Sequence, residues 1–361
     1  MTLRNVVAAA ALVIVATAPL PASAEVPPNL SAIVAAWLAS PHAKRDAEAF
    51  THWNEEGAVE VECARCHSGP GFIDFVGADG SAAGVVDHPA ATGAPVDCAT
   101  CHNPAAMALE SITFPSGVTV AGLGASSVCT VCHQGRESGD SVAAALAGME
   151  EDAVSADLAF INVHYRAAAA TLLGGAVRGG YQYDGKTYVE RFVHPAPLDS
   201  CTGCHNPHSL EVAMTSCVAC HKTSETIAAI RTGTADLDGD GDVTEGVAGE
   251  IATLHERLGQ GIAAYAAEVA GAPIVYDPNV YPYFFNDTDA DGAVGAGEAV
   301  FPNRYASWTP RLLRAAYNYQ FLAKDPGAFA HNPRYATQIT YDSLEDLSQK
   351  VDIDMGGMTR P

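Results

Sequence analysis

The chain has 361 residues, with 19 Lys and Arg against 42 Asp and Glu, which gives a formal net charge of −23 at pH 7. A protein this acidic repels nucleic acid and anionic membrane surfaces, so neither is an expected partner. Metal cations and basic proteins are more compatible partners. Part of the negative charge is also explained without a partner, because charge repulsion keeps a protein soluble.

Residues 1–24 have the pattern of a cleaved secretory signal. Arg4 precedes an apolar run at 6–18, and the segment ends in the small residues Ala22-Ser23-Ala24. The alternative is a membrane anchor, but the apolar run is shorter than the ~20 residues that span a bilayer. No later stretch is long and apolar enough to span one. We therefore expect secretion across the inner membrane, to the periplasm or the cell surface.

Residues 25–222 contain all ten cysteines, and each cysteine belongs to a Cys-x-x-Cys-His motif. The five motifs are Cys63-Ala-Arg-Cys66-His67, Cys98-Ala-Thr-Cys101-His102, Cys129-Thr-Val-Cys132-His133, Cys201-Thr-Gly-Cys204-His205 and Cys217-Val-Ala-Cys220-His221. Two thiols at this spacing can each bind one vinyl group of a haem, and the histidine that follows can bind the iron. Disulfides and zinc are the alternatives, but an adjacent Cys-His pair fits a zinc tetrahedron badly. The motifs predict five covalently bound haems c.

Each iron then needs a sixth ligand or has an open face. Eight further histidines are available, and Met107 and Met214 are the methionines near the motifs. We favour histidine on every iron, with the following five as distal candidates: His42, His52, His164, His194 and His208. His88 and His331 are in reserve, and His255 lies on an apolar stripe typical of a helix core.

Local patterns support several of these histidines. Ser40-Pro41 predicts the start of a helix that reaches Trp53 and carries His42 and His52. A second helix is predicted from an N-cap at Asp157 to Leu173, before Gly174-Gly175, with His164 on a face of small side chains that lets a porphyrin approach. His208 follows the fourth motif closely and can bind the iron of a neighbouring haem.

Residues 223–361 have no cysteine and predict helices at about 250–270, 310–324 and 343–351. Thr309-Pro310 is a start signal for the second helix, and Asp342 with Glu345 forms a capping box for the third. The expected fold is mainly α with extensive irregular loops, in which a haem-binding core is joined to a helical C-terminal region.

Two acidic loops in the C-terminal region resemble EF-hand calcium loops. The first offers Asp287, Asp289, Asp291, the backbone of Ala293 and Glu298. The second offers Asp236, Asp238 and Asp240, but Val247 stands at position 12, where Glu245 is a substitute. Calcium is therefore an expected second cofactor, and the alternative is a solvated acidic turn.

The chain resembles the secreted multihaem c-type cytochromes of metal- and sulfur-respiring bacteria. The resemblance rests on the five motifs and on "CHNPHSL", "NVHYRAAAATLLGG", "WTPRLLRAAYNYQF" and "DPGAFAHNPRYATQITYDSLEDL". It implies electron transfer with redox proteins or extracellular electron acceptors, in some members through conductive polymers of the cytochrome, so self-association into filaments is compatible with it.

Two functions follow from these features. An electron carrier has six-coordinate irons throughout, whereas a multihaem reductase of a small oxyanion or sulfur compound has one open iron with nearby groups that handle charge and protons. Arg65, inside the first motif, and Arg136, just after the third, are the candidate cations for such a role. The surplus of histidines favours the carrier, and a catalytic activity is the alternative.

Overall fold

The computed structural model describes residues 29–222 and 225–361, so the predicted signal segment 1–24 lies outside the described residues. The described chain is rich in helix and has two small antiparallel sheets. One pairs β1 (Ser111–Thr113) with β2 (Thr119–Ala121), and the other pairs β3 (Ile274–Tyr276) with β4 (Phe284–Asn286). The prediction of a mainly α chain is confirmed at this level.

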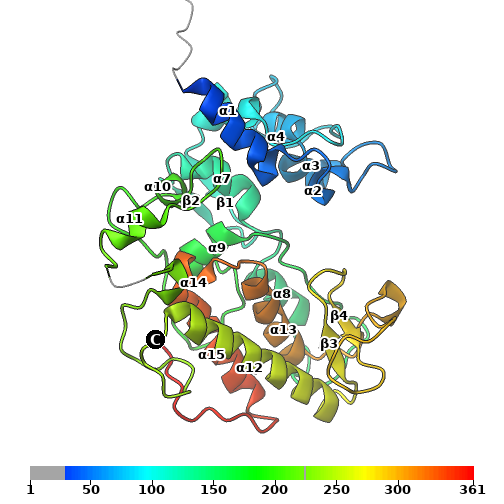
Figure 1. The fold of residues 1–361 in the computed structure, drawn as a ribbon. Helices are drawn as coiled ribbons and strands as arrows, with labels where there is room; N and C mark the ends of the chain where they lie inside the picture. The colour runs from blue at the N-terminus through cyan, green and yellow to red at the C-terminus, as the bar shows by residue number, and fades with distance from the viewer. Residues whose placement is uncertain (1–28, 223–224) are drawn as a thin grey trace, which may run out of the picture.

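The N-terminal part, at the top of Figure 1, consists of short helices joined by loops. They are α1 (Leu30–Ala39), the 3-10 turn η1 (Pro41–Ala43), α2 (Glu48–Thr51), α3 (Val61–His67), α4 (Gly69–Phe75), α5 (Cys98–Cys101) and α6 (Pro104–Met107). The predicted continuous helix from Pro41 to Trp53 is wrong. The 3-10 turn ends with Lys44 in an extended conformation, so the chain leaves helical geometry before α2 begins.

The middle part carries the last three motifs. Its helices are α7 (Ser126–His133), α8 (Gly139–Leu146), α9 (Ala168–Leu173), the 3-10 turn η2 (Gly174–Ala176), α10 (Cys201–Cys204) and α11 (Met214–Val218). The predicted helix from Asp157 is wrong, because α9 begins only at Ala168. His164 and Arg166 have φ values of 78° and 57°, a left-handed geometry that interrupts an α-helix. The predicted end before Gly174 is confirmed.

The C-terminal part contains the three longest helices of the described chain. Its helical elements are the 3-10 turn η3 (Ile227–Ala229), α12 (Val247–Glu268), the 3-10 turn η4 (Phe301–Asn303), α13 (Pro310–Ala323), α14 (Ala328–His331) and α15 (Pro333–Leu347). Thr309 caps α13 as predicted, since its side chain accepts a hydrogen bond from the Leu312 amide. Helix α15 begins ten residues earlier than the predicted start at 343.

The start of α15 is set by Asn332 and Pro333. Asn332 Oδ1 accepts a hydrogen bond from the Tyr335 amide, and Pro333 occupies the first helical position. Asp342 therefore lies inside the helix, where its carboxylate binds Arg360 and the Tyr188 hydroxyl. The predicted capping box at Asp342 is wrong for this reason.

One hydrophobic core joins the middle and C-terminal parts. Trp308, Leu313 and Phe321 are completely buried, and Val163 and Ala170 from the loop and helix before the fourth motif belong to the same core. Helix α9 packs against α14, as can be followed in Figure 1. No helix within residues 29–222 and 225–361 combines the length and apolar character needed to cross a membrane.

Candidate functional site

A single connected cavity of about 3720 Å³ runs along the motif-bearing parts of the molecule. It is lined by all ten cysteines and by the five motif histidines. Six further histidines also line it: His42, His52, His164, His194, His208 and His331. Pockets for single small ligands are commonly about 300–1,000 Å³, so this cavity has room for several large cofactors.

Short helices present the motif cysteines to this cavity. Asp97 caps α5 and Ser200 caps α10, in each case by accepting a hydrogen bond from an amide one turn later. Each of these two helices therefore begins directly at the first cysteine of its motif. All ten thiols are free, which leaves both sulfurs of every motif available for covalent attachment.

Four motif histidines face a second histidine ring, and three of these facing rings were distal candidates. His67 Nε2 lies 3.3 Å from His164 Nε2. The ring centroids of His102 and His208 are 6.1 Å apart and nearly parallel, those of His133 and His42 are 6.4 Å apart, and those of His205 and His331 are 6.3 Å apart. Two nitrogens that bind one metal from opposite sides lie about 4 Å apart, given bonds of about 2 Å. The His67–His164 separation approaches this value.

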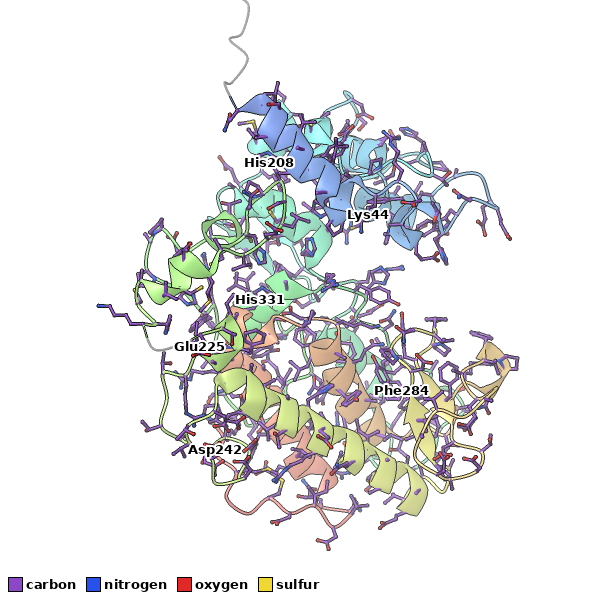
Figure 2. The ribbon with its side chains drawn as sticks, in the orientation of Figure 1. Lys44, His208, Glu225, Asp242, Phe284 and His331 are labelled. Carbon is purple, nitrogen blue, oxygen red and sulfur yellow. The ribbon has the colours of Figure 1, made fainter. Side chains whose placement is uncertain are left out.

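The fifth motif histidine, His221, has His194 as its neighbour. Burial lowers the pKa of His194, and the proximity of His221 lowers it further. Every Cys-x-x-Cys-His motif therefore has one additional histidine beside it. Figure 2 shows His208 near the top of the molecule, beside the N-terminal helices, and His331 near the middle, so the pairs are spread along the cavity.

Several of these rings are oriented by a hydrogen bond from Nδ1. His67 donates to the Ala49 carbonyl oxygen at 2.7 Å, His133 to that of Arg166 at 3.0 Å, and His205 to that of Leu210 at 3.2 Å. A carbonyl oxygen can only accept, so the proton is on Nδ1 and Nε2 presents a lone pair. This is the tautomer that binds a metal through Nε2.

His331 is oriented in the same way by a carboxylate. Its Nδ1 donates to both oxygens of Asp325 at 2.9 Å. Burial alone would lower the pKa of His331, but the bond to Asp325 outweighs it and the pKa is raised. Among the histidines that face a motif histidine, His331 is the one that was not among the five distal candidates and was kept in reserve. No spacing relative to a motif identifies it, because it comes from α14, far along the chain.

Burial favours the neutral form of two further histidines, His42 and His164. It lowers the pKa of His42 to about 4, with His133 contributing, and the pKa of His164 to about 4, with His67 contributing. A neutral imidazole at physiological pH is the form that binds iron.

His52, His88 and His255 have other surroundings. His52 contacts Glu48 at 2.9 Å and packs edge-on against Trp53, at the rim of the cavity. His88 contacts Asp74 and Asp87, and its pKa is raised chiefly by the bond to Asp87. His255 stacks on Tyr319 at 4.0 Å and bonds to its carbonyl oxygen. Neither His88 nor His255 is among the residues that line the cavity.

Neighbouring motifs approach one another through their cysteines. The Cys66 thiol lies 3.9 Å from the Val131 carbonyl oxygen and the Cys132 thiol lies 3.6 Å from that of Arg65, which joins the first motif to the third. The Cys201 amide donates to Ser126 Oγ at 3.1 Å, and Cys201 is close enough to raise the pKa of Cys129, which joins the third motif to the fourth. The spatial order of the motifs therefore differs from their order in the sequence.

The two remaining motifs extend this series. Cys101 of the second motif is close enough to the third motif to raise the pKa of Cys129 and Cys132, although Cys201 and Cys66, respectively, and burial have larger effects. Cys217 likewise raises the pKa of Cys204, behind burial. The third motif lies at the junction between the first, second and fourth, and the fifth lies beyond the fourth.

A polar cluster surrounds the His67–His164 pair. Arg136 Nη1 lies 4.0 Å from Cys63 Sγ. Lys324 Nζ lies 4.0 Å from the ring centroids of both Tyr165 and Tyr283, and burial lowers the pKa of Lys324 to about 8. Arg65, the other expected cation, lies over the Phe75 ring at 5.5 Å.

The first acidic loop brings its aspartates together. Ligand atoms of Asp287, Asp289 and Asp291 lie within 4.8 Å of one another. Asp287 is buried, and its Oδ1 has no hydrogen-bond partner among the described residues. Glu298 closes the loop by accepting hydrogen bonds from the amides of Thr288 at 2.6 Å and Gly295 at 2.8 Å.

Known proteins resemble the chain over most of its length. It is 28% identical, over 84% of its length, to the C-type polyheme cytochrome OmcB of two Geobacter sulfurreducens strains, DL-1/KN400 and ATCC 51573/DSM 12127/PCA. It is equally similar to the C-type polyheme cytochrome OmcC of the latter strain. These matches cover 46% and 45% of the relatives, so the chain spans about half the length of the curated relatives it matches. They support the expected relationship to multihaem c-type cytochromes. No protein-family profile and no solved structure matches the chain.

Proposed function

We propose that this chain is an electron-transfer protein of the multihaem c-type cytochrome class, with five haems c attached at the five motifs. The observation that carries the proposal is the shared cavity, which all ten motif cysteines and all five motif histidines line. The relationship to polyheme cytochromes supports covalently bound haem and electron transfer as the general activity.

The residues fit haem in their chemistry as well as in their spacing. Both thiols of each motif are free for thioether bonds, and Nδ1 of His67, His133 and His205 holds the proton, so that Nε2 is available. Haem iron, once bound, supplies a one-electron couple whose potential depends on its axial ligands and their hydrogen bonds.

Five histidine pairs would hold the irons in this proposal. They are His67 with His164, His102 with His208, His133 with His42, His205 with His331, and His221 with His194. Two protein ligands on an iron leave no face for a substrate. This arrangement supports an electron carrier over a reductase, which needs an open iron.

The contacts between neighbouring motifs support transfer along the cavity. The first and third motifs contact each other through Cys66 with Val131 and Cys132 with Arg65, which would bring the edges of the two attached groups close together. The third and fourth motifs are likewise joined by the Cys201 amide and Ser126 Oγ. The series of neighbouring motifs therefore offers a continuous route instead of five isolated centres, with the third motif as its junction.

Calcium at the first acidic loop is a further part of the proposal. Three converging aspartates, a buried Asp287 oxygen without a partner, and Glu298 at position 12 match the ligand types of a calcium loop. Calcium there would hold the β3–β4 region in place and is structural in this proposal.

The proposed partners are redox proteins or extracellular electron acceptors, and the proposed location is the periplasm or the cell surface. Self-association into conductive filaments is compatible with a cavity that extends through much of the molecule. Electron microscopy of the purified holoprotein tests that point.

The central experiment is to produce the chain with an export and haem-attachment system, and to count the haems by mass spectrometry. We expect five haems per chain and no free thiol. We also expect the ferric protein to give only low-spin signals. Fewer than five haems would contradict the attachment proposal, and a high-spin signal from one haem would favour the reductase.

A further inference from the structure

The second acidic loop lies beside the start of α12, where Figure 2 labels Asp242. Its aspartates converge with two glutamates that follow them in the sequence. Ligand atoms of Asp238, Asp240 and Glu245 lie within 4.8 Å of one another, and so do those of Asp236, Asp238 and Glu250. Asp238 belongs to both groups and is therefore the centre of the cluster.

Two carboxylate oxygens in this cluster are buried without a partner. Asp238 is completely buried, and its Oδ2 accepts no hydrogen bond from any described residue. Glu245 Oε1 is likewise buried and unpartnered within the described chain. A buried carboxylate oxygen that is neither paired nor hydrogen-bonded is strongly unfavourable. Both oxygens point to a bound cation that the protein itself does not provide.

Two further carboxylates of the cluster, those of Asp236 and Glu250, are already engaged. Glu250 pairs with Arg231 through one oxygen, and its other oxygen accepts hydrogen bonds from the amides of Leu237 and Asp238. Asp236 accepts hydrogen bonds from the amides of Gly239 and Gly241. These two residues therefore shape the loop, and Glu250 holds Asp238 in place through its backbone.

The electrostatics of the cluster agree with an unbalanced negative charge. Burial, together with the negative charges of Asp238 and Glu250, raises the pKa of Glu245 to about 7. Burial also raises the pKa of Asp238, with Glu250 and Asp240 adding to the effect and the hydrogen bond from the Asp240 amide opposing it.

We propose that Asp238, Asp240 and Glu245 bind one divalent cation, for which calcium is the best chemical match. Calcium prefers six to eight hard oxygen ligands in flexible arrangements, which suits loop carboxylates completed by water. Glu245 takes the part that a glutamate at position 12 has in an EF-hand, where this chain has Val247. The site departs from the EF-hand pattern and does not depend on the proposed haems.

The local backbone accommodates Glu245 in this role. A Cβ at position 249 would lie 1.7 Å from Glu245 Oε2, so the glycine there leaves room for the carboxylate against the first turn of α12. A Cβ at position 239 would lie 2.7 Å from the Gly356 carbonyl oxygen, and the Thr359 amide donates to the Leu237 carbonyl oxygen at 3.3 Å. The cation would therefore join the loop and α12 close to the C-terminal segment.

The test uses the haem-loaded full chain with a Glu298→Gln substitution, which disables the first acidic loop. After chelation, calcium is added to millimolar concentration, because extracellular modules bind it with Kd of about 10⁻⁴–10⁻³ M. We expect calorimetry to detect one equivalent of bound calcium and thermal unfolding to shift upward. Glu245→Gln on this background should remove the calcium response and raise the Tm of the calcium-free protein, because a buried unpaired charge is removed.

The matched control is Glu268→Gln, an exposed glutamate near the end of the same helix. It should leave both the binding and the unfolding shift unchanged. Absence of a calcium response in the Glu298→Gln protein, or an undiminished one after Glu245→Gln, would overturn the proposal. The haem content and spin state are recorded on the same samples, so failure of the calcium site is distinguishable from failure of the electron-transfer proposal.

Discussion

His331 faces His205 across the cavity, with ring centroids 6.3 Å apart. His205 belongs to the fourth motif, whereas His331 ends α14 in the C-terminal part. Asp325 holds the imidazole by two contacts of 2.9 Å. The helical C-terminal part therefore completes a site whose cysteines lie in the motif-bearing part of the chain.

The first prediction compares His331 with His52. His52 was a distal candidate, but its ring packs against Trp53 and is not in any of the five histidine pairs. His331→Ala should convert one haem in five to the high-spin form, because one iron loses its sixth ligand. His52→Ala should leave the spectrum unchanged, since its ring pairs with Glu48. Electron paramagnetic resonance of the ferric proteins measures both. A high-spin signal from His52→Ala alone would reverse the assignment.

The second prediction concerns the Asp325 carboxylate. Hydrogen bonding to a carboxylate makes an imidazole a stronger electron donor, which stabilises ferric iron. Asp325→Asn should therefore raise the reduction potential of one haem while every haem stays low-spin. A spectroscopic redox titration checks this. An unchanged titration curve in a correctly folded variant would show that Asp325 does not act on an iron through His331.

Calcium removal provides the third prediction. In the Glu245→Gln protein, 1 mM calcium should raise the stability through the first acidic loop alone, by about 0.4–1.4 kcal/mol for a Kd of about 10⁻³–10⁻⁴ M. Asp289→Ala should abolish this gain, and Asp352→Ala, at an exposed site, should retain it. Thermal unfolding with and without a chelator gives the result. Equal melting temperatures in the Glu245→Gln protein under both conditions would count against calcium at this loop.

The fourth prediction is a pH dependence caused by Lys324, whose pKa burial lowers from 10.5 to about 8. Between these pH values the unfolded chain binds more protons than the folded protein, so the Lys324 contribution to the free energy of unfolding rises with pH. The rise should amount to about 1–3 kcal/mol. Below pH 8 the full cost of burying the charge is present.

Lys324→Met should remove this part of the pH dependence, and Lys44→Met, at an exposed lysine, should not. Denaturant unfolding at several pH values between 7 and 10.5 measures it. Parallel pH profiles for wild type and Lys324→Met would mean that Lys324 keeps its ordinary pKa in the folded protein.

A local sequence signal predicted the start of α13 correctly, whereas α15 begins ten residues before its predicted start. Thr309-Pro310 identified the start of α13 because a cap and a proline act within one turn. The same type of reasoning failed at Asp157, where small helix-forming residues suggested a continuous helix. Bonds from distant segments determine that stretch: the Arg136 amide donates to the Val163 carbonyl oxygen, and the Arg166 amide donates to that of Lys324.

The residues of the candidate site were likewise predictable where a local pattern marks them and unpredictable where distant segments meet. The Cys-x-x-Cys-His spacing is a local pattern, so the attachment points could be read directly. His42, His164, His194 and His208 were chosen from their surroundings, and each lies beside a motif histidine in the structure. His331 could not be chosen, because its partner is set by the packing of α14 on α9, a contact between distant parts of the sequence.

The supply of His331 by α14 has a consequence for biogenesis. All five motifs precede α14 in the sequence, so in the proposed exported protein they would leave the export channel first. Enzymes that join haem to the thiols could then act while the fourth motif still lacks its facing histidine. Contacts of such long sequence separation form late in folding. Docking of α14 would then be a late step of maturation, and a truncation before it would yield a protein that carries its haems but traps one in an immature ligation state.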